Sequence, residues 1–215
     1  MRIFIIAGEA SGDFLGAGLM RALLHRNPDI HFTGIGGSRM AAAGLISIFP
    51  MEELSVMGLA EVLPKLFRIL RRIRQTSRAI LKTKPDAVIT IDLPDFCFRV
   101  VQKVKAKDKT IPCIHYVAPS VWAWRPGRAK KVAKFLDYLL TLLPFEPPYF
   151  EEHGLQASFV GHPIVERMDQ RGDGMRFRQK YEIEESQPIL CLLPGSRMSE
   201  VSRLLDVFAG TADRI

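Results

Sequence analysis

Apolar residues follow two alternating patterns along the first 160 or so residues. Short continuous apolar runs predict strands that are buried on both faces of a parallel sheet, and stretches with three- and four-residue spacing predict helices. The candidate strands are residues 2–7, 31–37, 46–49, 87–91, 111–117, 137–144 and 157–160. Their alternation with helical stretches predicts an α/β fold, a Rossmann-like, doubly wound parallel sheet with right-handed crossovers.

A second, shorter pattern follows the segment Arg171-Gly172-Asp173-Gly174, which we interpret as a hinge. A short helix near 175–181 precedes an apolar strand at 188–193, and a final helix opens at Glu200. We expect a first domain at 1–168, a hinge at 169–186 and the start of a second Rossmann-like domain at 187–215. One strand and one helix cannot bury themselves, so we expect the rest of that domain to be missing or supplied by a partner chain.

The first strand runs directly into the small-residue turn Gly8-Glu9-Ala10-Ser11-Gly12-Asp13 and then into a helix. A helix N-terminus beyond the carboxyl end of a parallel strand offers free N–H groups to an anion. Neither this turn nor Gly34-x-Gly36-Gly37 has the G-x-G-x-x-G spacing of dinucleotide sites, so we expect no nicotinamide or flavin cofactor. A ligand is expected to meet Ser11 and its neighbours.

The most apolar run, 87–91, delivers Asp92 to its carboxyl end, and a helix follows from about Asp95 to Lys107. Asp95 is placed to cap that helix, since a carboxylate accepts its free N–H groups and opposes its dipole. Asp92 has no capping role. It is therefore a candidate general base, the alternative being a local turn formed with Pro94.

The stretch 61–84 predicts an amphipathic helix whose polar side is basic, because no acidic residue follows Glu61 until Asp86. A one-signed basic face beside an apolar stripe suits an anionic bilayer surface. The alternative is a core-facing helix with a solvated basic side; nucleic acid is not expected as a partner. The residues predicted to face the membrane are Val62, Leu66, Ile69, Leu70 and Ile73, with Arg68 and Arg72 beside them.

An aromatic and basic loop follows the strand at 111–117 and contains Trp122, Trp124 and Arg125. It can serve as a lipid-interface anchor, a sugar-stacking surface or ordinary packing under the loop. His115, within the strand, is predicted to be a core histidine with satisfied hydrogen bonds rather than a metal ligand.

Composition narrows the class of protein. The net charge of +7 favours acidic partners. The three cysteines lack C-x-x-C spacing and lie in apolar runs, which predicts buried, inert thiols in a reducing cytoplasm. No stretch approaches the roughly 20 apolar residues of a membrane span, and Glu9 and Asp13 interrupt the first run, so we expect neither a membrane span nor a signal peptide.

Five motifs together resemble the lipid-A-disaccharide synthase family. The resemblance runs from Arg2 to the end of the chain. The motifs are residues 7–13 with Gly16-Ala17, Met51-Glu52-Glu53-Leu54-Ser55-Val56-Met57-Gly58, Asp92-Leu93-Pro94-Asp95-Phe96, residues 115–125, and Leu193-Pro194-Gly195-Ser196-Arg197.

The resemblance implies a two-domain GT-B glycosyltransferase, cytoplasmic but peripheral to the inner membrane of Gram-negative bacteria, with no metal or redox cofactor. It would join UDP-2,3-diacylglucosamine to 2,3-diacylglucosamine 1-phosphate, releasing UDP. Asp92 would deprotonate the acceptor 6-hydroxyl. The resemblance also implies substrate contacts from Glu9, Ser11, Asp13, Trp122 and Arg125, and donor phosphate contacts from Gly195, Ser196, Arg197 and Glu200.

Since the chain ends one strand and one helix into the second domain, we expect it alone to bind the donor poorly and to turn over little or nothing. Two other interpretations stay open. One is an inactive membrane-binding remnant. The other is a different GT-B-type enzyme of UDP-sugars, such as an epimerase, which would have no use for the basic amphipathic helix.

Overall fold

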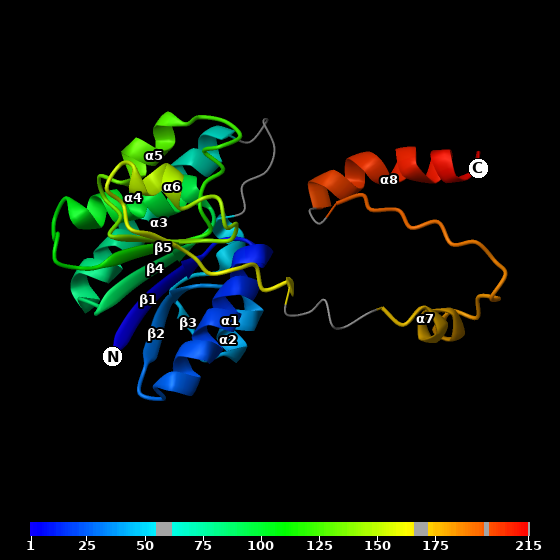
Figure 1. The fold of residues 1–215 in the computed structure, drawn as a ribbon, viewed down its shortest axis with the longest axis horizontal. Coiled ribbons are helices and arrows are strands. Elements are labelled where there is room, and N and C mark those ends of the chain that lie inside the picture. Colours follow the sequence, from blue (N-terminus) through cyan, green and yellow to red (C-terminus); the bar gives the residue numbers. More distant parts are fainter. Residues whose placement is uncertain (55–61, 166–171, 196–197, 215) are drawn as a thin grey trace. The chain divides into compact units, whose positions relative to one another are not determined.

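The chain forms two units, shown in Figure 1. The computed structural model describes residues 1–54, 62–165, 172–195 and 198–214. The larger unit extends to Pro163, and the smaller unit continues from Ile164. Each is described by itself below.

A seven-stranded parallel sheet forms the centre of the larger unit, in the order β3-β2-β1-β4-β5-β6-β7. The strands are β1 (Arg2–Ala7), β2 (His31–Ile35), β3 (Ile46–Ser47), β4 (Ala87–Ile91), β5 (Cys113–Tyr116), β6 (Tyr138–Thr141) and β7 (Ala157–Phe159). Each coincides with an apolar run, so the predicted seven-strand, doubly wound sheet is confirmed.

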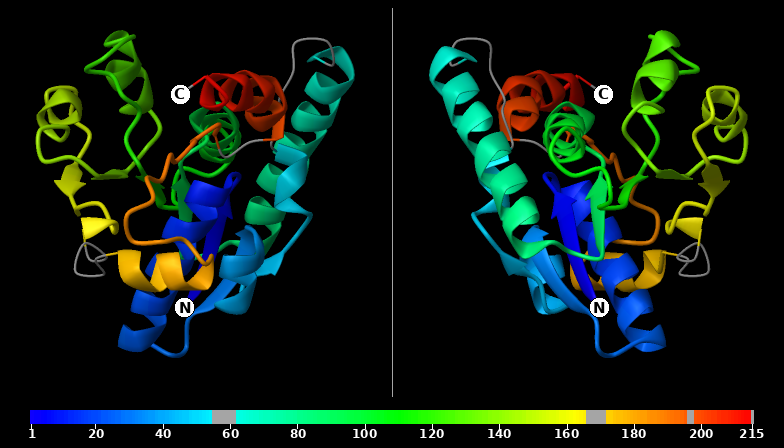
Figure 2. Two further views of the ribbon diagram at one scale, coloured as in Figure 1. Left: turned by 90° about the vertical axis from the view of Figure 1, so that its right-hand side faces the viewer. Right: turned by 90° about the vertical axis from the view of Figure 1, so that its left-hand side faces the viewer.

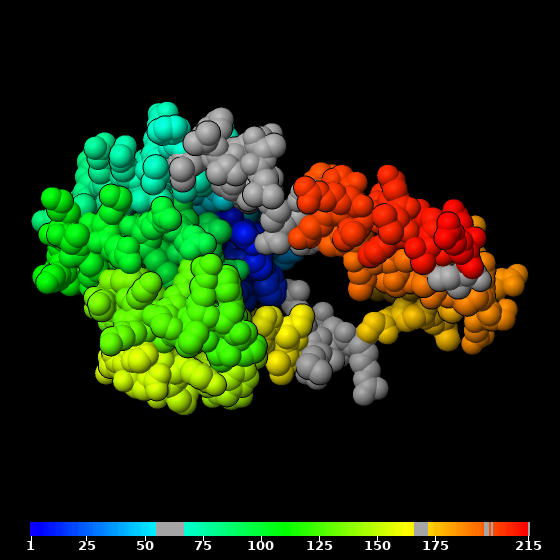
Figure 3. Space-filling model, turned by 90° about the horizontal axis from the view of Figure 1, so that it is seen from above, coloured from blue at the N-terminus to red at the C-terminus, as the bar shows by residue number. Residues whose placement is uncertain are grey.

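Helices cover both faces of this sheet (Figures 1 and 2). One face carries α1 (Ala10–Arg26) and α2 (Ser38–Ala42). The other carries α3 (Val62–Thr83), α4 (Pro94–Lys105), α5 (Gly127–Val132) and α6 (Pro148–Glu151). In Figure 3 the cyan, green and yellow-green segments that contain these four helices cover most of the visible surface of the larger unit. A short 3-10 helix, η1 (Met51–Leu54), precedes α3.

Two hydrophobic cores result, one on each side of the sheet. Along β1, Phe4 and Ile6 belong to the core under α3 and α4, whereas Ile3 and Ile5 belong to the core under α1 and α2. Successive strand residues point to opposite faces, so a strand covered on both sides must be apolar at every position. This is why the run 2–7 does not alternate with polar residues.

The apolar stripe of α3 packs inside the protein, so the prediction that it faces a membrane is wrong where its side chains are described. Ile73 is 1% exposed in the core, and Ile69 and Leu70 are partly buried against the same core. Of the other predicted membrane-facing residues, the side chains of Val62 and Leu66 lie outside the described residues. An apolar stripe marks only which side of a helix avoids water. Here α4 packs against that side, and Ile73 shares one core with strand residues such as Phe4 and Val88.

Arg72 also serves the fold rather than a membrane surface. Its guanidinium donates from Nε to Glu53 Oε2 at 2.8 Å and lies 4.3 Å from the ring centre of Phe49. Arg72 thereby ties α3 to η1. Arg68 is exposed, as is Phe67 beside it.

Two of the three cysteines are buried as predicted. Burial, and then the charge of Asp92, raise the pKa of the Cys97 thiol, and burial raises that of Cys113 to about 12, so both stay neutral. Cys191, in the smaller unit, is exposed, which corrects the prediction for it.

The smaller unit contains α7 (Gly174–Lys180) and α8 (Met198–Ala212) in its described part. Residues 188–193, predicted to form a strand, are largely exposed and have no strand conformation. A strand needs a neighbour whose backbone groups pair with its own, and the described residues of this unit supply none. The final helix lies where the sequence predicts it.

His115 lies in β5 and is fully buried, as predicted for a core histidine, but only one of its ring nitrogens is satisfied. Nδ1 shares a hydrogen bond of 2.7 Å with Thr90 Oγ1, and Nε2 has no partner among the described residues. The ring packs edge-on against Phe98, 4.7 Å between centres. Burial first, and to a smaller extent the positive charge of Arg128, lower the pKa of His115 to about 3.

Replacing Ile73 by alanine should lower the free energy of unfolding of the larger unit by about 2 to 5 kcal/mol, because it leaves a cavity between α3 and the sheet. Urea unfolding followed by tryptophan fluorescence measures this, since both tryptophans, Trp122 and Trp124, lie in the larger unit. Arg74→Ala, on the exposed side of the same helix, is the control and should change stability little. A small effect of Ile73→Ala would indicate that the stripe is not a core surface.

His115 should make the larger unit less stable in mild acid. The unfolded chain protonates this side chain near its ordinary pKa of 6.5 and the folded protein only near 3, so acidification in that interval favours the unfolded state. Relative to His115→Gln, the wild type should lose up to about 1.4 kcal/mol per pH unit below pH 6.5. Parallel pH profiles for the two proteins would contradict a depressed pKa.

Candidate functional site

The candidate site lies at the carboxyl edge of the sheet, where the strand order reverses. The chain moves from β1 to β2 and β3 on one side, then crosses back so that β4 pairs with the other edge of β1. Open α/β sheets bind ligands in the crevice outside the strand ends at such a switch point. Ala7 pairs with Ile91, so the turn after β1 and the turn after β4 start side by side at this edge of the sheet.

Asp92 is the first residue beyond β4 and has a left-handed backbone. Its φ is +52° and that of Leu93 is +43°, a conformation that a non-glycine residue, and leucine especially, rarely adopts. The Asp92 N–H donates to the Tyr116 carbonyl at 3.0 Å, which pins this turn to the end of β5. Strained backbone of this kind concentrates at functional sites.

Ser11 and Asp92 meet across the strand ends. Ser11 is exposed in the first turn of α1, and its Oγ donates to Asp92 Oδ2 at 3.4 Å. The Asp92 carboxylate is half-buried and so is partly shielded while remaining accessible. A hydrogen bond from Ser11 restricts the orientation of the carboxylate group.

Glycines let α1 begin this close to β4. A Cβ on Gly8 would overlap Leu93 Cδ2, and one on Gly12 would lie 3.3 Å from Ala7 Cβ and 3.5 Å from the Ile91 carbonyl oxygen. Glu9, also a predicted site residue, is the half-buried N-cap of α1 and the second residue after β1. The glycines at this turn therefore allow the start of α1 to lie close to the ends of β1 and β4.

Asp13 has a different place from the one that the resemblance implies. Its side chain is buried, Oδ1 accepts from the N–H groups of Gly37 at 2.8 Å and Met40 at 3.0 Å, and Oδ2 accepts from Arg39 at 3.0 Å. The carboxylate thus satisfies free N–H groups at the N-terminus of α2. Asp13 is a positioning residue that joins α1 to α2, and its buried carboxylate faces the start of α2.

Asp95 does not cap α4, because the helix already begins at Pro94. Leu93 is the N-cap, and Asp95 stands in the first turn with an exposed side chain that accepts from Arg128 Nη2 at 3.0 Å. This ion pair links the starts of α4 and α5. Arg128 has no signal in the sequence beyond its place in the run of basic residues after Trp124.

The aromatic and basic loop starts beside Asp92, because Tyr116 pairs with Ile91 at the end of β5. Trp122 in this loop contacts two residues that follow β6. Its Nε1 donates to Glu146 Oε1 at 3.4 Å, and its ring packs edge-on against Phe145 with 5.3 Å between ring centres. Glu146 is buried and was missed by the sequence analysis, since its role depends on a residue 24 positions away.

Trp124 and Arg125 form the exposed tip of the same loop. The Arg125 guanidinium lies 4.2 Å from the Trp124 ring centre, and 57% of Trp124 is exposed. A guanidinium stacked on an indole is a rigid, cationic, flat surface that suits an anionic or sugar ligand.

The predicted donor-phosphate residues are only partly described. Ser196 and Arg197 lie outside the described residues. Gly195 has φ +114°, and a Cβ there would lie 2.8 Å from Glu200 Cβ, so the two ends of this turn approach closely. No group of three or more His, Cys, Asp or Glu arranged to hold a metal occurs in the part of the chain that the structure describes.

Comparisons with known proteins identify the family. A family model described as lipid-A-disaccharide synthetase matches residues 3–215. Curated lipid-A-disaccharide synthases match at 57% identity (Rhodospirillum centenum, 98% of this chain, 53% of the relative), 53% (Ruegeria pomeroyi, 100% and 53%) and 46% (Pseudomonas aeruginosa, 100% and 56%). The chain spans about half the length of the curated relatives it matches.

Solved structures agree on the fold. The Staphylococcus aureus MnaA–UDP structure has a TM-score of 0.56 at 14% identity, covering 84% of this chain and 50% of that one. UDP-GlcNAc 2-epimerase from Neisseria meningitidis has a TM-score of 0.53 at 11% identity, covering 86% and 55%. These likenesses show the Rossmann-like, GT-B type of fold alone. With the family match over its whole length, the chain belongs to the lipid-A-disaccharide synthase family.

Proposed function

We propose that this chain is the acceptor-side part of a glycosyltransferase of lipid A biosynthesis. The whole protein transfers the acylated glucosamine of UDP-2,3-diacylglucosamine to the 6-hydroxyl of 2,3-diacylglucosamine 1-phosphate, giving the β-1,6-linked disaccharide and UDP. One observation carries the proposal: in a chain of this family, Asp92 offers an accessible carboxylate, on a strained backbone, at the switch point of the sheet.

In this proposal Asp92 is the general base. Its carboxylate takes the proton of the acceptor 6-hydroxyl while that oxygen attacks the anomeric carbon of the donor. The bond between the anomeric carbon and the UDP oxygen breaks, and UDP leaves with the bonding electrons. Positioned carboxylates contribute about 10²- to 10⁴-fold to such steps.

Ser11 acts as a positioning residue by donating to Oδ2 of Asp92, which leaves Oδ1 to face the acceptor. Trp122, Arg125 and Glu9 are proposed to contact the acceptor, since their segments follow β5 and β1 at the same edge of the sheet as Asp92. Gly195, Ser196, Arg197 and Glu200 are proposed to hold the donor phosphates.

We propose further that the protein works at the cytoplasmic, anionic surface of the inner membrane, because both substrates carry acyl chains. No helix among the described residues has the length and apolar character needed to cross a bilayer. The exposed aromatic and basic tip at Trp124 and Arg125, rather than the buried stripe of α3, is the surface with an interface character.

Asp92→Asn should lower UDP release by about 10²- to 10⁴-fold, because an amide keeps the size of the side chain but cannot take up a proton. The assay uses a chimaera in which this chain is continued by the C-terminal part of the Rhodospirillum centenum relative, with both acylated substrates. Asp29→Asn is the matched control: it removes an exposed carboxylate just before β2, at the opposite edge of the sheet from Asp92, so turnover should stay close to wild type.

Turnover of the Asp92→Asn chimaera close to wild type would remove the base role. Conversion of UDP-N-acetylglucosamine without any acceptor would indicate an epimerase instead. A chimaera that binds vesicles but shows no Asp92-dependent UDP release would indicate an inactive membrane-binding remnant.

A further inference from the structure

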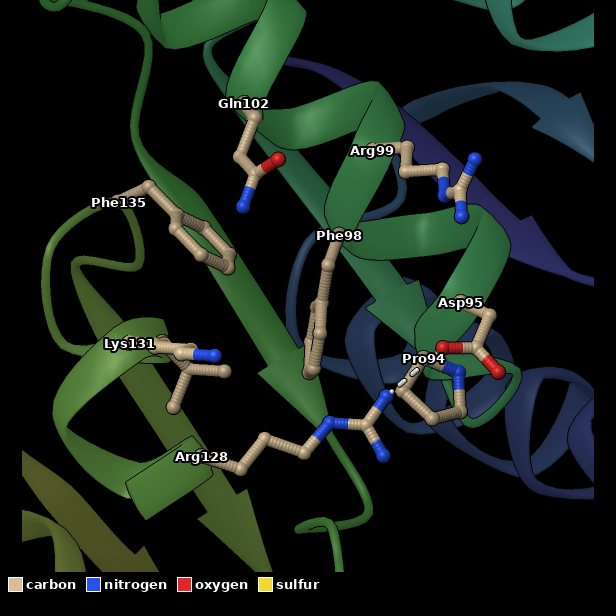
Figure 4. Close-up of a pocket in the computed structure, with 9 residues that line it drawn as sticks. Pro94, Asp95, Phe98, Arg99, Gln102, Arg128, Lys131 and Phe135 are labelled. Atoms are coloured by element: carbon tan, nitrogen blue, oxygen red, sulfur yellow. Dashed lines mark hydrogen bonds and ion pairs between the residues drawn. The ribbon is translucent and has the colours of Figure 1, made fainter. Parts of the chain in front are cut away.

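A basic groove runs between α4 and α5 (Figure 4). We define the α4–α5 groove by Phe98, Arg99, Arg128, Lys131 and Phe135. Its cavity of about 200 Å³ adjoins a second of about 410 Å³, which Arg125 and Gly127 line together with Arg128 and Lys131. The two cavities therefore share a pair of cationic side chains.

The charge of the groove is one-sided. Arg99, Arg125, Arg128 and Lys131 line the two cavities, against the single carboxylate of Asp95. Asp95 accepts one hydrogen bond from Arg128, and an arginine has five N–H donors, so Arg128 keeps donors for an anion. Guanidinium and ammonium groups around an open cavity suit a phosphate ester.

Part of the groove lining is apolar, since Phe98, Val132 and Phe135 belong to it. Figure 4 shows the ring of Phe98, which extends from α4, near the ring of Phe135 and the side chains of Lys131 and Arg128. The Arg128 guanidinium lies 5.7 Å from the Phe98 ring centre, so this cation is oriented by an aromatic face as well as by Asp95. A ligand with both a phosphate and an apolar part matches this lining better than a free inorganic anion.

The groove begins next to the candidate base. Pro94 and Asp95 line its near end, and they follow Asp92 and Leu93 directly in the chain. A single amphiphilic acceptor can therefore present a hydroxyl to Asp92 and a phosphate to the groove. We propose that Arg128 and Lys131 form the phosphate subsite for the acceptor, an inference that rests on the proposed function.

Binding of short-chain 2,3-diacylglucosamine 1-phosphate and of its unphosphorylated analogue to the full chain tests the subsite without requiring turnover. Trp122 and Trp124, the two tryptophans of the protein, adjoin Arg125 in the loop that leads into α5, so their fluorescence reports ligand binding. We expect the phosphorylated ligand to bind at least about tenfold more tightly, since charge-assisted hydrogen bonds contribute this much.

Arg128→Gln and Lys131→Gln should each remove most of that preference and leave the unphosphorylated analogue unaffected. Lys131→Gln guards against a folding effect, because Lys131 is exposed and Arg128 also holds Asp95. Lys130→Gln, an exposed neighbour on α5 that lines neither cavity, is the matched control and should keep the preference.

Equal affinity of the wild type for both ligands, or an equal loss for both in the variants, would overturn the proposal. Co-sedimentation with vesicles of phosphatidylcholine, with and without phosphatidylglycerol, tests whether the groove binds the phosphate of a lipid headgroup instead of the acceptor phosphate. Loss of phosphatidylglycerol-dependent binding in Arg128→Gln and Lys131→Gln, with the acceptor preference retained, would assign the groove to a lipid headgroup and overturn the acceptor subsite. Asp92-dependent UDP release without any phosphate preference would overturn the subsite while leaving the proposed reaction standing.

Discussion

Backbone pairing among β1, β4 and β5 aligns their last residues, with Ala7 beside Ile91 and Ile91 beside Tyr116. Since all three strands are parallel, three loops that are far apart in the sequence leave the sheet at one edge. The reversal of strand order between β1 and β4 keeps the crevice there uncovered by a crossover helix. Every residue proposed to meet the acceptor depends on this alignment.

Close packing of α1 is what converts that alignment into a site. Gly8 and Gly12 allow the helix to start against the end of β4, so Ser11 reaches Asp92. Asp92 and Leu93 take left-handed backbone conformations, and so connect the end of β4 to the start of α4 within two residues. Asp13 also fixes α1 to α2, because its carboxylate accepts hydrogen bonds from the N–H groups at the start of α2.

Charge is distributed over two regions of the larger unit. The exposed arginines of α3 surround no cavity among those described, whereas Arg128 and Lys131 line two adjoining cavities next to the aromatic loop. Net positive charge alone therefore indicates an acidic partner without locating it. Location depends on which cations lie around a concave, partly apolar surface, and only packing of α4 against the α5 segment creates that surface.

The sequence by itself determined the strand and helix order, the doubly wound sheet and the placement of Ser11 and Asp92 at strand ends, because these follow from local periodicity and from connection rules. Only the tertiary structure decided what covers each apolar surface and which polar groups meet. The stripe of α3 has the same pattern whether a sheet or a bilayer covers it, and Ile73 proved to be a core residue. Asp13 and Arg128 find their partners 24 or more residues away, at separations that no local pattern records.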